Sequence, residues 1–246
     1  MIAPLLSLPA LQRTVQVVFL TVVVAMLTAC AVPTMKPEQA AMVRNVGVIS
    51  LLPTDLVYDK IGVTVFNNER ATRPIGDAFN SAARLGAERV LKAGGRTVVP
   101  LSVDTRALGV QLYSRSLVMR FSSERIQKQL AALAKENKLD AIVLVAETFD
   151  SDNGLRGVRL FLRAGFGDIR FATARPDLST TLVDANGEVI AIKGNAIGVA
   201  VERPQRQPWA YSLEENLDAG TNEFVSATMQ RIIESVVADR VREMGF

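Results

Sequence analysis

The stretch Ser122-Ser-Glu-Arg-Ile-Gln-Lys-Gln-Leu-Ala-Ala-Leu-Ala-Lys-Glu-Asn-Lys-Leu-Asp-Ala-Ile-Val-Leu-Val-Ala146 decides the fold class. A Ser-Ser-Glu start signal precedes apolar residues at helical spacing from Ile126 to Ala134. Asp140 to Ala146 is then a continuous apolar run, which is typical of a strand buried on both faces. A helix followed directly by a buried strand predicts an α/β domain.

The segments on either side extend this prediction. Before the stretch, the sequence predicts strands at 43–53, 58–66 and 96–101 and a helix at 75–91. After it come a strand at 157–166, a turn or bulge at 165–168, a loop at 202–212 and a helix at 217–244. Asn186-Gly187 predicts a hairpin between strands 178–184 and 189–192, because this pair tolerates a positive φ at both turn positions. We therefore expect one mixed α/β (α+β) domain over residues 43–246, with one mixed sheet.

The first thirty residues predict an export signal. Arg13 precedes an apolar run from Val15 to Leu27, which is shorter than the roughly 20 residues that span a bilayer. The run ends in Leu27-Thr-Ala-Cys30, which resembles the bacterial lipobox. This resemblance implies cleavage before Cys30, a lipid on its thiol and acylation of the new amino group. An ordinary cleaved signal, or a short buried helix with a chance cysteine, is the alternative.

The lipobox divides the chain and implies a location. Residues 1–29 would be removed, and residues 30–42 would form a lipid-anchored tether. Ala31, rather than an aspartate, follows the cysteine, which by the family sorting rule implies the outer membrane. We expect the domain at the periplasmic face of that membrane, with the covalent lipid on Cys30 in place of any cofactor. A surface-exposed orientation stays open.

The order of elements resembles that of periplasmic lipoproteins with an anticodon-binding-like α/β domain. This group includes the penicillin-binding-protein activator lipoproteins, the curli secretion lipoprotein and the N-terminal domain of TolB. The matching segments are Val46 to Pro53, Asp140 to Ala146 and the hairpin Leu182 to Val189. The resemblance covers about half of the mature chain in outline and implies an adaptor, activator or assembly part of an envelope machine without catalysis. Lys60–Asn68 and 202–212 do not fit it.

The composition excludes several kinds of chemistry. The 246 residues contain 28 Lys and Arg against 25 Asp and Glu, and this net charge of +3 disfavours a nucleic-acid-binding role. The chain has no histidine, which removes Ser-His-Asp and Cys-His catalysis and every His-ligated metal site. Its one cysteine leaves no internal disulfide and no cysteine-based zinc site. We therefore expect no catalytic residues and no metal.

Two segments carry residues that are typical of protein-binding surfaces. Arginines and aromatics alternate in the segment that contains Arg159, Phe161 and Arg163. Its alternative is an antiparallel sheet with one solvated face. The loop 202–212 contains the only tryptophan, and we expect Trp209, Tyr211 and Arg206 to contact a partner. A tryptophan that plugs the sheet edge is the equal alternative.

Acidic side chains supply two weaker candidates. Asp150, Asp152 and Asn153 follow the buried strand, where α/β folds often bind ligands, so this loop is a candidate ligand site. A polar turn is its alternative, because the pattern is shorter than an EF-hand and no glutamate closes it. A carboxylate-dependent hydrolase would draw its pair from Asp140, Glu147, Asp150 and Asp184, although the spacing singles out no pair.

The sequence thus predicts a non-catalytic, outer-membrane-anchored lipoprotein that binds an envelope protein partner. Two alternatives stay open. The first is a self-assembling envelope or secretion component, which would be a homo-oligomer. The second is a carboxylate-dependent hydrolase acting on cell-wall glycan.

Overall fold

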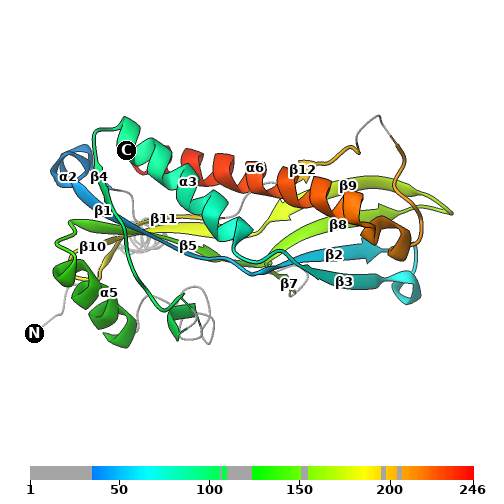
Figure 1. Ribbon diagram of the computed structural model, residues 1–246, viewed down its shortest axis with the longest axis horizontal. Helices are drawn as coiled ribbons and strands as arrows, with labels where there is room; N and C mark the ends of the chain where they lie inside the picture. The colour runs from blue at the N-terminus through cyan, green and yellow to red at the C-terminus, as the bar shows by residue number, and fades with distance from the viewer. Residues whose placement is uncertain (1–34, 106, 110–123, 151–154, 195–197, 204–206) are drawn as a thin grey trace, which may run out of the picture. The chain divides into compact units, whose positions relative to one another are not determined.

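Two five-stranded sheets, flanked by helices, make up the fold (Figure 1). The structure is a computed structural model that describes residues 35–105, 107–109, 124–150, 155–194, 198–203 and 207–246. Thr34–Phe246 form one compact unit. The mixed α/β class is confirmed, but the second sheet was not predicted.

The first sheet has the strand order β11-β10-β5-β1-β4. β1 pairs in parallel with β4 and β5, whereas β10 is antiparallel to both β5 and β11. β5 lies at the centre and is buried on both faces, as its apolar run predicts. The strands are β1 (Asn45–Leu51), β4 (Thr97–Val99), β5 (Ala141–Glu147), β10 (Leu178–Asp184) and β11 (Val189–Gly194).

The second sheet has the strand order β12-β9-β8-β2-β3. Its three central strands continue three strands of the first sheet: β1 leads into β2, β9 leads into β10, and β8 follows β5 after a short β6–β7 hairpin. This continuity explains why β2 and β8 are parallel, like β1 and β5. The bounds are β2 (Asp55–Ile61), β3 (Glu69–Pro74), β6 (Phe149–Asp150), β7 (Leu155–Arg156), β8 (Val158–Ala164), β9 (Ile169–Pro176) and β12 (Val199–Ala200).

Helices cover the sheets unequally (Figure 1). α3 (Ala78–Ala93) packs on β1 and along α6 (Ala219–Glu243), and α6 also contacts β9 and β10, so that it bridges both sheets. The main core lies between these helices and the sheets. α5 (Glu124–Glu136) covers the opposite face of the first sheet with a smaller core. Among the described residues, no helix has both the length and the apolar character to cross a membrane.

Several boundaries differ from the predictions for a physical reason. A helix, α2 (Pro37–Met42), occupies part of the expected tether, and its Ala40 is buried and accepts a hydrogen bond from Arg96. The Asn186-Gly187 hairpin forms, but only Gly187 has a positive φ, of 83°. Gly187 donates to Asp184 O in the turn, and a register shift follows in the strands. The wider turn therefore needs one left-handed residue rather than two. The described residues also include the short 3₁₀ turns η1 (Val65–Asn67) and η4 (Glu214–Leu217).

Candidate functional site

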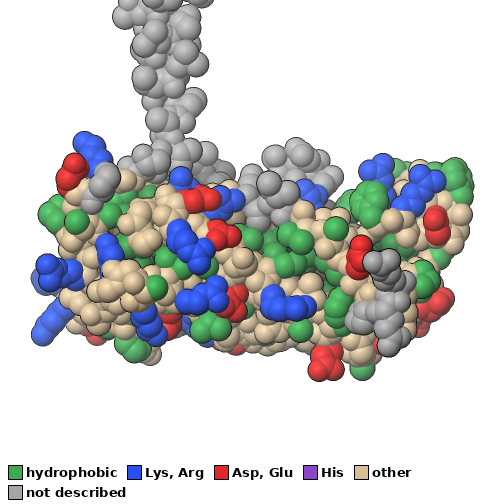
Figure 2. All heavy atoms as spheres, turned by 90° about the horizontal axis from the view of Figure 1, so that it is seen from above, with side chains coloured by type: hydrophobic (Ala, Val, Ile, Leu, Met, Phe, Trp, Pro, Cys, Tyr) green, Lys and Arg blue, Asp and Glu red, His purple; other side chains and the backbone are tan. Residues whose placement is uncertain are grey.

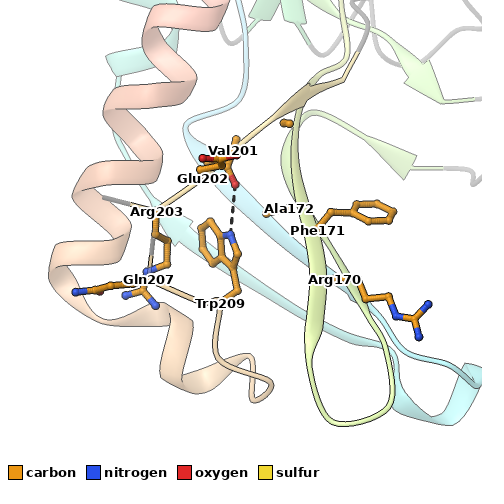
Figure 3. Close-up of a pocket in the computed structure, with 9 residues that line it drawn as sticks. Arg170, Phe171, Ala172, Val201, Glu202, Arg203, Gln207 and Trp209 are labelled. Atoms are coloured by element: carbon orange, nitrogen blue, oxygen red, sulfur yellow. Dashed lines mark hydrogen bonds between the residues drawn. The ribbon is translucent and has the colours of Figure 1, made fainter. Parts of the chain in front are cut away.

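A groove of about 470 Å³ opens at the β12 edge of the second sheet (Figure 3). One wall comes from β9 and the other from the chain that leaves β12 and leads to α6. The groove therefore includes Trp209 from the predicted loop 202–212, but none of Arg159, Phe161 and Arg163 from the other predicted segment. Its lining residues are Arg170, Phe171, Ala172, Ala200, Val201, Glu202, Arg203, Gln207 and Trp209.

Trp209 forms the apolar floor of the groove. Its side chain is buried, with the residue only 8% exposed, and its indole N–H donates to the carbonyl oxygen of Val201 at 3.3 Å (Figure 3). The Arg203 guanidinium carbon lies 5.6 Å from the centre of the indole ring, within cation–π range. The floor is thus fixed before any ligand arrives, which lowers the entropy cost of binding.

The loop around Trp209 is held by polar side chains beneath it. Asn216 is fully buried, and its amide group bonds both the N–H and the carbonyl oxygen of Ala210 and the carbonyl oxygen of Ser212. Arg203 donates to the Thr221 hydroxyl at 2.8 Å. These bonds tie the groove to the start of α6, so the loop is part of the fold rather than a loose connection.

Asp218 caps α6 beside this loop. Thr221 donates to the Asp218 carboxylate from its side chain and from its backbone N–H, the latter at 2.9 Å. These hydrogen bonds, first the one from the hydroxyl, lower the pKa of Asp218, and the nearby charge of Arg203 acts in the same direction. The capped helix start therefore carries a carboxylate at neutral pH, as helix N-termini favour.

The β9 wall begins where the pairing between β9 and β12 ends. β12 pairs with β9 only at Ala174 and Thr173, and Val201 adds one hydrogen bond to the carbonyl oxygen of Ala172. The two chains then diverge, and the groove begins where they part. Phe171 is 46% exposed on this wall, and Arg163 of β8 stacks on its ring at 5.8 Å.

The charges at the groove favour an acidic ligand. Arg170 is exposed and Arg203 half-buried, and Glu202 is the one acidic side chain among the lining residues. Arg203 also lies 4.0 Å from the Asp218 carboxylate, so Arg170 is the exposed cation that a ligand can meet at this partly apolar surface. Such a surface can hold an extended segment that offers an apolar side chain and a carboxylate.

The structure separates the predicted partner-binding residues. Trp209 lies in the groove, but it is buried there and forms the floor. This position agrees with the alternative in which the tryptophan plugs the sheet edge. Tyr211 is half-buried outside the lining, with Lys60 Nζ 4.1 Å from its ring centre. Phe161 and Arg163 lie on the face of the second sheet that points away from α6. Arg206 falls outside the described residues.

Arg159 is buried, contrary to the prediction of a surface position. It is 1% exposed and pairs with Asp177 and, at 3.5 Å, with Asp59. Along β8, Arg159 alternates in the same pattern as Phe161 and Arg163, so it shares their face of the strand. Unlike them, it lies at the junction of the two sheets, where it is buried. A side chain enclosed in this way offers no surface to a partner.

The predicted ligand loop lies largely outside the described residues. Asp152 and Asn153 are among the residues not described, and Asp150 is described only as backbone of β6. A second cavity, of about 520 Å³, does lie at the carboxyl ends of β1 and β5. Its buried Asn80 already accepts from Ser50 and Leu52 and donates to Leu52, so this amide is committed to the fold.

Of the four candidate hydrolase carboxylates, Asp140 and Glu147 lie at opposite ends of β5, whereas Asp184 pairs with Ala141, next to Asp140. Asp140 accepts two backbone N–H bonds, from Arg44 and Asn45, at the start of β5. Glu147 ends the same strand, about 23 Å away at 3.3 Å per residue. Glycosidase pairs lie within about 10 Å. Among the described residues, no three acidic or sulfur side chains are grouped to hold a metal ion.

Sequence reasoning missed part of the groove. Ala200 and Val201 line it, yet nothing in their local sequence marks a site. Phe171 and Arg170 follow Phe161 and Arg163 in the chain but were not among the predicted contact residues. Their place in the lining of the groove depends on β12, a two-residue strand without a sequence signal.

Comparisons with known proteins find only distant likenesses. No family model and no curated protein matches the chain. Among solved structures it is similar to lipoprotein GNA1162 from Neisseria meningitidis, at 16% identity over 77% of this chain and 97% of that chain, with a TM-score of 0.30. It is also similar to the PelC dodecamer from Paraburkholderia phytofirmans, at 12% identity over 85% of this chain and 93% of that chain, with a TM-score of 0.32. Likenesses this distant assign neither a family nor a function.

Proposed function

We propose that this chain is a lipid-anchored, non-catalytic protein of the bacterial outer membrane that binds another envelope protein through the Trp209 groove. The single observation that carries the proposal is the groove itself. It combines a fixed aromatic floor, an exposed Phe171 and two arginines at an open sheet edge.

The groove fits one extended segment of a partner. A segment that lies along β9, where β12 ends, would place one apolar side chain against the exposed ring of Phe171. An acidic group of the same segment would then meet Arg170. Binding of an extended segment at a sheet edge is a common mode of peptide recognition.

The anchor and the lack of catalysis rest on the sequence. The lipobox-like Leu27-Thr-Ala-Cys30 supports lipidation of Cys30 and a location at the periplasmic face of the outer membrane. The absence of histidine from the whole chain removes the commonest general base. The dispersed positions of Asp140 and Glu147 further support binding over hydrolysis.

Photo-cross-linking in living cells tests the proposal. A cross-linking amino acid replaces Phe171 or Gln207, both of which are exposed in the groove, with Cys30 intact. Trp209 is unsuited because it is buried. Leu85, which is 56% exposed on α3, serves as the matched control.

We expect one recurrent foreign protein from both groove positions and not from Leu85. Cross-links only to copies of the same chain would replace the proposal with the self-assembling alternative. An equal set of products from Leu85 and from the groove, or none from the groove, would contradict it.

A further inference from the structure

Two neighbouring turns at the end of the second sheet expose apolar side chains. β2 and β8 run in parallel, with Ile61 paired to Arg163, so the turns that follow them lie side by side. Figure 1 shows both turns at the same end of the sheet. We call residues 62–68 and 165–168 together the tip.

The apolar side chains of the tip are among the most exposed in the described residues. Phe66 is 93% exposed and Phe166 is 86% exposed, each from a different turn. Val65 and Val63, at 77% and 48%, extend the apolar surface. Because these side chains bury almost nothing, they do not serve the core, and such exposure marks a contact surface.

Both turns are built so that they hold these side chains outward. Gly62 donates to the Asn68 side chain at 3.0 Å, and the Thr64 hydroxyl donates to the Asn67 side chain at 2.8 Å. In the other turn, Gly165 donates to the carbonyl oxygen of Asp168 at 2.7 Å. Gly167, with φ of 85°, takes the left-handed conformation that this turn requires.

Positive side chains surround the base of the tip. Arg163 and Arg170 are both exposed on the strands that lead into and out of the second turn. The Asp168 carboxylate and the Arg170 side chain both lie beside Gly165, where a Cβ would approach them within 2.3 Å and 2.6 Å. Figure 2 shows hydrophobic and Lys or Arg side chains together at this end of the molecule.

We propose that the tip binds an anionic phospholipid surface. Phenylalanine and valine side chains enter the boundary between headgroups and acyl chains, while arginines remain at the phosphates. The tip consists of two short turns that lie side by side. This small size also favours lipid over protein, because protein hot spots lie within broad, closely packed patches.

The tip is a second attachment, separate from the predicted lipid anchor. β1 and β2 run from α2 to the tip over about 17 residues, or up to about 55 Å at 3.3 Å per residue. The N-terminal side of the domain and the tip therefore lie at opposite ends of these strands. Contact at both ends would orient the strands along one membrane surface.

Depth-dependent quenching tests this proposal on the full chain. The protein is reconstituted into vesicles of phosphatidylcholine and phosphatidylglycerol whose acyl chains carry bromine. Phe66→Trp and Phe166→Trp report from the tip, and the native Trp209 is a buried reference present in every variant. Leu85→Trp is the matched control, because Leu85 is also apolar and exposed but lies on α3.

We expect the brominated lipids to quench the added tryptophan of both tip variants at least twofold more than that of Leu85→Trp. With phosphatidylcholine alone, or after Arg163→Gln with Arg170→Gln, the quenching should fall severalfold. Tip quenching no greater than that of Leu85→Trp would overturn the proposal. Tip quenching that is unchanged without anionic lipid would overturn the role of the arginines. Near-ultraviolet circular dichroism confirms that each variant is folded.

Discussion

Arg159 and Asp177 form a buried ion pair at the junction of the two sheets. Asp177 is the single residue between β9 and β10, and Arg159 lies in β8, which continues the line of β5. Arg159 Nε donates to the Asp177 carboxylate at 3.2 Å, and Asp59 of β2 adds a second carboxylate at 3.5 Å. The pair therefore links the strands that pass from one sheet to the other.

Replacing Arg159 should destabilise the fold strongly. Arg159→Met leaves the buried Asp177 carboxylate without its cation, whereas Asp59 keeps Arg70 at 2.6 Å, and loss of one partner of a buried pair costs about 3–5 kcal/mol. Urea unfolding measures the change. Arg163→Met, which removes an exposed arginine from the same strand, should cost less than about 1 kcal/mol. Equal costs for the two variants would contradict the structural role of the pair.

Stability should fall at alkaline pH because of Tyr58. Burial raises the pKa of the Tyr58 hydroxyl well above its ordinary value, and the hydroxyl donates to Asn222 at 2.5 Å. The native state then stays protonated while the unfolded chain ionises near about pH 10. The free energy of unfolding therefore decreases as pH rises above about 10 and is unaffected by this group below that range.

Unfolding measured from pH 8 to 11 checks this. Tyr58→Phe should flatten the alkaline decrease, at a cost of about 1 kcal/mol at neutral pH for the lost hydrogen bond. Tyr211→Phe should retain the decrease. A slope that is the same in Tyr58→Phe and the native chain would refute the assignment to Tyr58.

Gly86 sets the close approach of α3 to α6. A Cβ on Gly86 would lie 2.3 Å from the carbonyl oxygen of Glu234, which is backbone and cannot swing away. Gly86→Ala should therefore force the helices apart and cost about 1–3 kcal/mol. Gly220→Ala, where the nearest atom is a side-chain oxygen at 3.3 Å, should change stability by less than about 0.5 kcal/mol. Thermal unfolding compares the two.

Asn216 should control the accessibility of the groove floor. Asn216→Ala leaves backbone groups of Ala210 and Ser212 without their partner, at a cost of about 1–3 kcal/mol, and frees the loop that carries Trp209. Because Trp209 is the only tryptophan, its fluorescence reports this directly. Acrylamide quenching should increase and emission shift to the red. Asn186→Ala, in the β10–β11 turn, should change neither, and unchanged quenching in Asn216→Ala would count against the account of the loop.

The first sheet could be predicted from sequence because its signals are local. The apolar run Ala141–Ala146 is too continuous for a half-exposed strand, and the turn residues Asn186 and Gly187 locate the hairpin. The α6 stripe that includes Val225, Met229 and Ile233 also repeats with helical period and is buried as expected.

The second sheet could not be predicted, because its edge strands form by pairing with their neighbours and carry no apolar alternation of their own. β3 reads Glu-Arg-Ala-Thr-Arg-Pro, with no apolar alternation, and forms only because β2 is beside it. Lys60 is 2% exposed, although its sequence context does not suggest burial. Its charge is compensated by Glu69, which is opposite it on β3, and by the ring of Tyr211.

The candidate site, too, could be predicted only in part. The composition of residues 202–212 singled out Trp209 but could not distinguish a buried position on the floor of the groove from an exposed one. That distinction depends on the bond from Trp209 to Val201 and on the two-residue strand that places Val201. The groove brings together segments that are 38 residues apart, as Phe171 and Trp209 show, and no local signal encodes this.

The account rests on the groove as a protein-binding surface, and an equilibrium titration tests it most directly. The partner recovered by cross-linking is titrated against the full chain with Trp209 fluorescence as the signal. Phe171→Ser should weaken binding by about tenfold or more, whereas Phe66→Ser, at the tip, should leave the dissociation constant unchanged. Equal affinity of Phe171→Ser and the native chain would contradict the account.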